Sequence, residues 1–174
     1  MGSQVNINQL KHWYLIHSKP QQEYLAKNNL ERQGYEIYVP LAPVHRRRRG
    51  RIRTEVGPMF PRYLFIRLNE AVDNWGPIRS TLGVTELVKF GQKPAHVPNN
   101  LIDTLKERED ANGIQVLPPK ILQKGQKIRI LEGPFEGYEG VFEVKSGRER
   151  VMILLKILEK QSRLEIEQSQ IEVI

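Results

Sequence analysis

The segment 110–120 divides this chain into two parts with different patterns. It contains Gly113, Pro118 and Pro119 and has no sustained apolar periodicity, which is typical of a linker. Short β-like runs separated by glycines follow it. A chain of 174 residues is long enough for two small domains. We therefore expect a first domain at residues 11–109, a linker at 110–122 and a second domain at 123–174.

Apolar patterning in the first part predicts a mixed α+β domain. We expect strands at residues 12–18, 35–39, 63–68 and 84–90, and helices at 18–33, 75–80 and 99–109. Ser18 and Gln21 have the spacing of a capping box, and Gly34 is suited to end the first long helix.

The second part contains a stretch that fits two periods, VMILLKILEKQSRL at 151–164. Period two makes it a strand buried on both sides, whereas period 3.6 gives a helical stripe of Val151, Leu154, Leu155 and Leu158. The neighbouring runs 127–131, 140–144, 164–166 and 171–174 are short, which predicts a small β-barrel.

The net charge of +7 lies entirely in the first part. Residues 1–107 contain 16 Lys and Arg against 9 Asp and Glu, whereas residues 108–174 contain 11 of each. An excess of Lys and Arg neutralises phosphate groups, so this asymmetry indicates a first domain that faces a polyanion.

The basic charge is densest in HRRRRGRIR, at 45–53, which contains six arginines. Gly50 is suited to the tip of a hairpin that would carry them away from the body, and guanidinium groups suit phosphate. We expect Arg46, Arg47, Arg48 and Arg49 to contact nucleic acid. A solvated loop whose charges aid solubility is the alternative.

The stretch PMFPRYLFI, at 58–66, is apolar on both strand faces. Tyr63 and Phe65 share one face, and Leu64 and Ile66 share the other. A central strand covered on both sides explains this pattern, and so does an exposed aromatic face that docks a partner.

Composition gives little support for an enzyme. The chain has no cysteine, its four histidines are not at metal-ligand spacing, and it contains no glycine-rich phosphate loop. We expect no catalytic residue, no metal and no cofactor. No apolar run approaches the roughly 20 residues of a membrane span, so we expect a cytoplasmic monomer that does not bind membranes.

Five motifs in order give the chain a family resemblance. WYLIHSKPQQE, LERQGYEIYVP, PMFPRYLFIRL, STLGVTELVKFG and GPFEGYEGVF extend from Trp13 to Phe142. Together they resemble the NusG family of transcription elongation factors, and within it the specialised RfaH branch. The resemblance implies a NusG N-terminal domain with a four-stranded antiparallel sheet and flanking helices. It also implies a C-terminal KOW module that forms an SH3-like β-barrel.

The resemblance also implies partners and site residues. It implies a transcription elongation factor and antiterminator that suppresses pausing and termination and couples transcription to translation. The expected contacts with the RNA polymerase clamp helices are Phe60, Pro61, Tyr63 and Phe65. Those with non-template DNA are Lys19, Arg32, Gln33, Arg49 and Thr81, while Asn29 and Leu82 replace a histidine and an arginine. A small-subunit ribosomal protein or a termination factor is a further partner. An RNA-binding or ribosome-associated KOW protein is the alternative function.

In the RfaH branch, the second module can instead form a helical hairpin that masks the clamp-binding surface. If masking occurs here, we expect Phe142, Leu154 and Leu158 to cover Tyr63 and Phe65, and Arg150 to form an interdomain contact. Ser146 with Glu149, and Glu159 with Arg163, have spacings that favour the second helix. A first helical arm through 127–142 would contain Pro134 and three glycines, which cost on the order of 6 kcal/mol. We therefore expect the barrel in the resting protein.

Overall fold

The computed structural model describes residues 11–116, 138–144 and 146–171. The strands are β1 (Lys11–Ser18), β2 (Glu36–Tyr38), β3 (Leu41–Arg48), β4 (Arg51–Pro58), β5 (Tyr63–Asn69), β6 (Val84–Leu87), β7 (Lys89–Phe90), β8 (Lys93–Pro94) and β9 (His96–Val97). The helices are α1 (Glu23–Arg32), α2 (Gly76–Arg79), α3 (Asn99–Glu107), α4 (Tyr138–Glu143) and α5 (Gly147–Ile171).

An antiparallel sheet forms the centre of the first part. Its strand order is β2-β5-β1-β6, and the short β9 also pairs with β1. The predicted four strands are therefore present with one short addition. The predicted strand at 84–90 is divided into β6 and β7, and β7 forms a separate two-stranded hairpin with β8.

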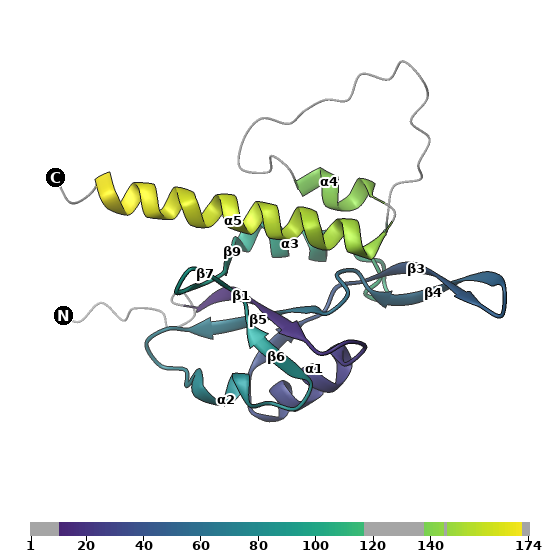
Figure 1. Ribbon diagram of the computed structural model, residues 1–174, viewed down its shortest axis with the longest axis horizontal. Coiled ribbons are helices and arrows are strands. Elements are labelled where there is room, and N and C mark those ends of the chain that lie inside the picture. Colours follow the sequence, from purple (N-terminus) through teal and green to yellow (C-terminus); the bar gives the residue numbers. More distant parts are fainter. Residues whose placement is uncertain (1–10, 117–137, 145, 172–174) are drawn as a thin grey trace, which may run out of the picture.

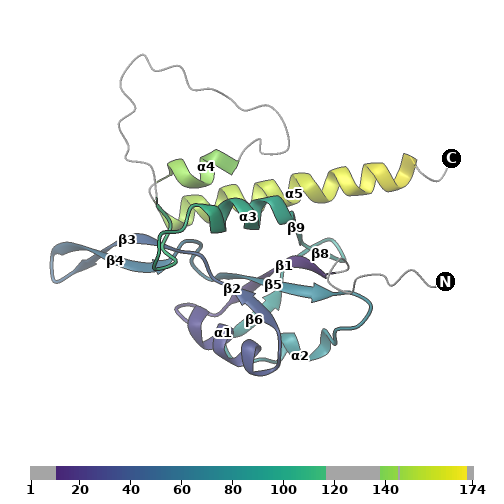
Figure 2. The ribbon, with the colours of Figure 1, turned by 180° about the vertical axis from the view of Figure 1, so that it is seen from behind.

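The sheet separates two apolar clusters because β5 is buried on both faces. Leu64 and Ile66 pack with Ala26 and Leu30 of α1 on one side. Phe65 belongs to the cluster on the opposite side, which α3, α4 and α5 help to form. Figures 1 and 2 show this layering, with α1 and α2 below the sheet and α4 and α5 above it. In this structure β5 is therefore a central strand covered on both sides, which is the first of the two explanations of the 58–66 pattern.

The start of α1 differs from the predicted capping box. Ser18 is the last residue of β1, and its hydroxyl donates to the carbonyl of Lys19 at 3.0 Å. Gln21 has a φ of 59°, and the helix begins at Glu23 without a side-chain cap. The prediction was wrong because β pairing holds Ser18 away from the helix. The predicted end of this helix at Gly34 is confirmed, since Gly34 has a φ of 93°.

The C-terminal part forms helices where we expected strands. Residues 140–143 lie in α4, and the runs at 151–158 and 164–166 lie in α5. The expected resting barrel is therefore wrong for the described residues; the expected strand at 127–131 lies outside them, as do residues 172–174. Among the described positions, α4 contains Gly140 and no proline, so most of the anticipated helix-breaking cost falls outside it.

Candidate binding surfaces

The C-terminal helices cover an apolar surface on β5 and on the turn before it. Phe60 is 1% exposed and Phe65 is fully buried, and their rings meet edge to face at 5.9 Å. Phe142 of α4 and Leu154 and Leu158 of α5 are buried in the same cluster. Fully burying one leucine side chain stabilises a contact by about 1.5–3 kcal/mol. Phe142, Leu154 and Leu158 therefore lie in one buried cluster with Phe60 and Phe65.

The other two residues of the expected clamp surface lie at its edge. Tyr63 is half-buried, packs against the same cluster and stacks on His17 with ring centroids 4.9 Å apart. Pro61 is exposed, yet its Cγ and Cδ atoms lie against Gly147 at the start of α5. Burial and the positive charge of Arg62 lower the pKa of His17.

Arg150 is an anchor inside this interface. Its side chain is 1% exposed, and Nη1 donates to the carbonyl of Met59 at 3.3 Å. Burial lowers the pKa of its guanidinium, which nevertheless stays charged. Glu55, a carboxylate on β4, contacts Arg46 and Arg48.

Two further contacts hold α4. The hydroxyl of Tyr138 donates to Oδ1 of Asn100 in α3 at 2.8 Å. The guanidinium of Arg108 lies 3.8 Å from the centre of the Phe142 ring, a cation–π contact. At the start of α5, the amide of Glu149 donates to the hydroxyl of Ser146 at 3.1 Å, so the predicted cap of this helix is confirmed.

The predicted arginine hairpin is confirmed as β3 and β4. Arg49 and Gly50 form its tip with φ values of 51° and 76°, and Figures 1 and 2 show the arm extending from the body. Arg46 pairs with Arg53 across the strands, and Arg48 pairs with Arg51. Paired residues, and residues two apart, share a face of a ribbon, so these four arginines lie on one face of the arm. We call it the arginine face.

The arginine face has one carboxylate within it. Glu55 lies 3.6 Å from Nε of Arg46 and 3.7 Å from Nε of Arg48. Near the tip, a cavity of about 470 Å³ is lined by Arg48, Arg49, Arg51 and Arg53. Arg47 faces the opposite side together with Ile52. One ribbon face therefore concentrates positive charge around a space that suits an anion.

A second group of predicted residues meets between α1 and the loop before β6. Nε2 of Gln33 donates to the hydroxyl of Thr81 at 2.8 Å, and Nδ2 of Asn29 donates to the carbonyl of Leu82 at 3.1 Å. Gly83 permits this approach, because a Cβ there would lie 2.8 Å from the amide nitrogen of Ala26. Gln33 is exposed, whereas Thr81 is 7% exposed.

Lys19 and Arg32 complete the predicted polar set, and both are exposed. The amide of Lys19 donates to the carbonyl of Gly83 at 2.8 Å, which ties it to the same loop. A groove of about 590 Å³ connects this region to the arm, since Pro20 and Gln21 line it together with Arg46. Ser146, Gly147 and Arg148 also line this groove. The start of α5 therefore borders the two basic regions.

Several residues of these surfaces were absent from our predictions. Arg51 and Arg53 belong to the arginine face, and strand alternation around Gly50 was the signal that would have placed them there. Tyr138, Val141 and Gly147 contribute to the covered interface. No local pattern identifies Gly147, because its role depends on a residue distant in the sequence.

The described part of the chain gives little support for a metal site or a membrane-spanning helix. Within residues 11–116, 138–144 and 146–171, no group of His, Cys, Asp and Glu is arranged to hold a metal ion. No helix among the same residues is long and apolar enough to cross a membrane. An apolar surface and a basic arm are features of a protein that acts by binding macromolecules.

Comparison with known proteins agrees with this class. The model of the family described as "Transcription termination factor nusG" matches residues 11–106. The NusG transcription termination/antitermination protein of Pseudomonas aeruginosa is 25% identical, with 94% of this chain and 99% of that protein aligned. The protein of the same name from Thermus thermophilus is 27% identical, with 91% and 96% aligned. The solved structure "Domain interaction in Thermotoga maritima NusG" is similar with a TM-score of 0.45 at 22% identity, covering 72% of this chain and 75% of that one.

The fold and the two surfaces define a class of protein that acts by binding macromolecules. The chain belongs to the NusG family, because the family model matches more than half of it. This family consists of transcription factors that are not enzymes, which confirms the expectation that the chain has no catalytic activity.

Proposed function

We propose that this protein is a transcription elongation factor and antiterminator of the specialised RfaH type, whose polymerase-binding surface is covered in the resting state. The observation that carries the proposal is the burial of Phe60 and Phe65 beneath Phe142, Leu154 and Leu158. An aromatic surface covered by another part of the same chain is protected until a partner displaces the cover.

The proposed partner of the apolar surface is the pair of clamp helices of RNA polymerase. Membership of the NusG family supports a polymerase partner. Phe60, Pro61, Tyr63 and Phe65 form a compact group at the start of β5, so uncovering them would expose one continuous aromatic and proline surface. Such surfaces supply binding energy through a few buried aromatic residues.

The proposed partner of the basic surface is the non-template DNA strand, with duplex DNA beside it. Lys19, Arg32, Gln33 and Thr81 would contact the single strand, and Arg46, Arg47, Arg48 and Arg49 would contact phosphates. The arm contains no Phe, Tyr or Trp between residues 41 and 58, so it offers no aromatic platform for stacking bases. A two-stranded ribbon can also enter the major groove of a duplex.

We further propose that residues 123–174 form a KOW module that becomes a β-barrel after release, with residues 110–122 as its linker. The period-two pattern of residues 151–158 supports such a second state. The released module would recruit a small-subunit ribosomal protein or a termination factor, and through the former would couple transcription to translation.

The test is binding to core RNA polymerase by full-length variants. Gly147→Val should push α5 away and increase binding, because a side chain at 147 overlaps Pro61. Adding Tyr63→Ala to Gly147→Val should remove most of that binding. Tyr24→Ala is the matched control, since Tyr24 is 46% exposed on α1, on the other side of the sheet. Paused elongation complexes with varied non-template sequences then test the DNA partner.

The alternative is an RNA-binding or ribosome-associated protein, which the basic arm favours. It predicts polymerase binding that is unaffected by Tyr63→Ala, together with RNA affinity that disappears when Arg46–Arg49 are replaced by glutamine. That pair of results would reject the elongation-factor proposal.

A further inference from the structure

The groove of about 590 Å³ at the start of α5 is built from both parts of the chain. The first domain contributes residues before α1, from β3 and from the turn before β5, and the second part contributes the start of α5. Figures 1 and 2 show this end of α5 close to the base of the β3–β4 arm. The groove therefore exists in this form only while α5 is docked.

Three arginines from separate segments line the groove. They are Arg46 of β3, Arg62 of the turn before β5 and Arg148 of α5. The one carboxylate among the described lining residues is Glu23, which is 7% exposed and accepts a hydrogen bond from the backbone amide of Arg62 at 2.9 Å. The lining therefore has an excess of guanidinium groups, which suits an anion such as a phosphate.

Two of these arginines keep donors for an anion. Nε of Arg62 donates to the carbonyl of Ser18 at 3.2 Å, which leaves the other N–H donors of its guanidinium. Arg62 also has a φ of 71°, a conformation that residues other than glycine adopt at a cost and that is common in binding sites. Arg148 is exposed, and no carboxylate of the described residues forms an ion pair with it.

Docking fixes the position of Arg148. Gly147, just before it, lies against Pro61, and Arg150, two residues after it, donates to the carbonyl of Met59 at 3.3 Å. These contacts hold the backbone on both sides of Arg148. Release of α5 breaks them and takes this guanidinium away from the groove.

We propose that the groove is a composite phosphate-binding site, in which Arg148 of the docked helix joins Arg46 and Arg62 in holding the backbone of a DNA strand. This inference rests on the proposed function, which makes DNA the partner of the basic surface. A strand that contacts both Lys19 and the arm crosses the groove, because Pro20 lines it next to Lys19 and Arg46 lines it at the arm. The docked chain then binds DNA more tightly than the released chain, and by reciprocity DNA stabilises docking.

The first test is the affinity of the full chain for a single-stranded DNA oligonucleotide, measured by fluorescence anisotropy without polymerase. Arg148→Gln should weaken binding about three- to tenfold and reduce the salt slope by about 1. Gly147→Val, which should increase polymerase binding, should weaken DNA binding by a similar factor. Arg163→Gln removes the same charge from the far half of α5, where Arg163 pairs with Glu159, and should behave like the parent. Equal effects of Arg148→Gln and Arg163→Gln would overturn the proposal.

The second test measures the reciprocal effect of DNA on docking. A saturating amount of the oligonucleotide should slow hydrogen exchange of the α5 amides in the parent, by about the factor that Arg148→Gln costs in affinity. Arg148→Gln should abolish this slowing and leave exchange in β1 and β5 unchanged, because Arg148 is exposed.

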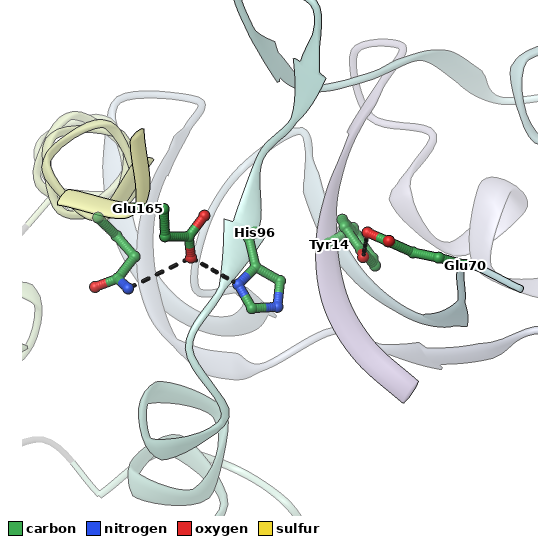
Figure 3. A network of polar contacts seen from close by, with 5 residues as sticks. Tyr14, Glu70, His96 and Glu165 are labelled. Carbon is green, nitrogen blue, oxygen red and sulfur yellow. Dashed lines mark hydrogen bonds and ion pairs between the residues drawn. The ribbon is translucent and has the colours of Figure 1, made fainter. Parts of the chain in front are cut away.

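Glu165→Gln is the matched control for a docking contact outside the groove. Oε1 of Glu165 lies 3.0 Å from Nδ1 of His96 in β9, about 25 Å further along α5 than Arg148 (Figure 3). This variant should keep the slowing by DNA. Inorganic phosphate at the same phosphate concentration should not slow exchange in the parent. Equal slowing by inorganic phosphate would assign the groove to a free anion, and no slowing by the oligonucleotide would show that α5 takes no part; either result overturns the proposal.

Failure of this inference differs from failure of the proposed function. If Arg46→Gln weakens DNA binding but Arg148→Gln does not, the basic surface remains and the composite site is rejected. If the parent binds no DNA, the composite site and the proposed DNA partner are both rejected. Polymerase binding by Gly147→Val is a separate measurement that neither result changes.

Discussion

Gly147 lies so close to Pro61 that a Cβ atom at position 147 would be 2.5 Å from Pro61 Cγ and 2.7 Å from Pro61 Cδ. This contact joins the first residue of α5 to the turn before β5. The ring of Pro61 is rigid and has no flexible end that can turn away. Close docking of the C-terminal helices therefore depends on glycine at this position.

Replacing Gly147 with alanine should weaken docking although it favours the helix. Alanine stabilises a helix interior by about 1 kcal/mol relative to glycine, and the gain is smaller at the first position of a helix, where the overlap with Pro61 opposes it. Hydrogen exchange of the α5 amides should become faster while that of β1 and β5 is unchanged. Slower exchange in α5 would contradict the expectation.

Gly140→Ala should stabilise the C-terminal helices, in contrast to Gly147→Ala. A Cβ at position 140 would lie 3.5 Å from Ile153 Cδ1, an ordinary van der Waals distance. The same gain in helix propensity, about 1 kcal/mol, then acts without a clash. Exchange of the α4 and α5 amides should slow by roughly fivefold.

Leu158→Ala should undock α5 without unfolding the first domain. Leu158 is 1% exposed, and replacing a buried leucine with alanine costs about 2–5 kcal/mol of stability. Amide exchange in α5 should therefore accelerate by about 30-fold or more. Met152 is on the same helix and 54% exposed, so Met152→Ala should change exchange little. Equal effects of the two variants would show that the apolar cluster does not hold the helix.

The arginine face should control nucleic-acid affinity through phosphate contacts. Arg48→Gln with Arg53→Gln should weaken binding to all sequences and reduce the salt slope by about 1 for each lost phosphate contact. Arg47→Gln should have a smaller effect because Arg47 faces the other side of the ribbon. Arg163→Gln on α5 is the charge-matched control, and titrations at several salt concentrations provide the measurement.

His17 should make the first domain less stable in acid. Burial and Arg62 lower its pKa in the folded chain, whereas an unfolded histidine titrates near about 6.5. The unfolded state therefore binds the proton first, so stability is complete above about pH 6.5 and falls as the pH drops towards the folded pKa. Urea unfolding at about pH 7.5 and pH 5.5 should show a smaller loss for His17→Gln than for the parent. His45→Gln, an exposed histidine on the arm, should behave like the parent.

Much of the first domain follows from local patterns. The two apolar faces of 63–66 are consistent with a strand that is covered on both sides, and β5 is covered in this way. Gly34 and Gly50 occupy positive-φ positions that other residues adopt at a cost, so the helix end and the hairpin tip were predictable. Ser18 was misjudged because its pairing partner, Val84, is distant in the sequence.

The candidate surfaces were predictable in type but not in arrangement. The number of arginines in 45–53 indicated a polyanion, whereas their grouping on one face follows from strand pairing. Arg150 was recognised as a contact residue, but its acceptor, the carbonyl of Met59, is a backbone atom that no side-chain motif reveals. The contact between His96 and Glu165 likewise joins two elements that only tertiary packing brings together.

The stretch 151–164 separates what sequence determines from what structure decides. Its residues determine that it is apolar and that Glu159 can pair with Arg163, and Ser146 just before it can cap a helix. Both contacts are present in the structure. They do not determine its secondary structure, because the same side chains satisfy period two and period 3.6. Packing decides in favour of the helix, which places Leu154 and Leu158 together in the cluster that contains Phe60 and Phe65. Helices in proteins gain most of their stability from such burial, so the surface of the first domain selects the conformation of the second.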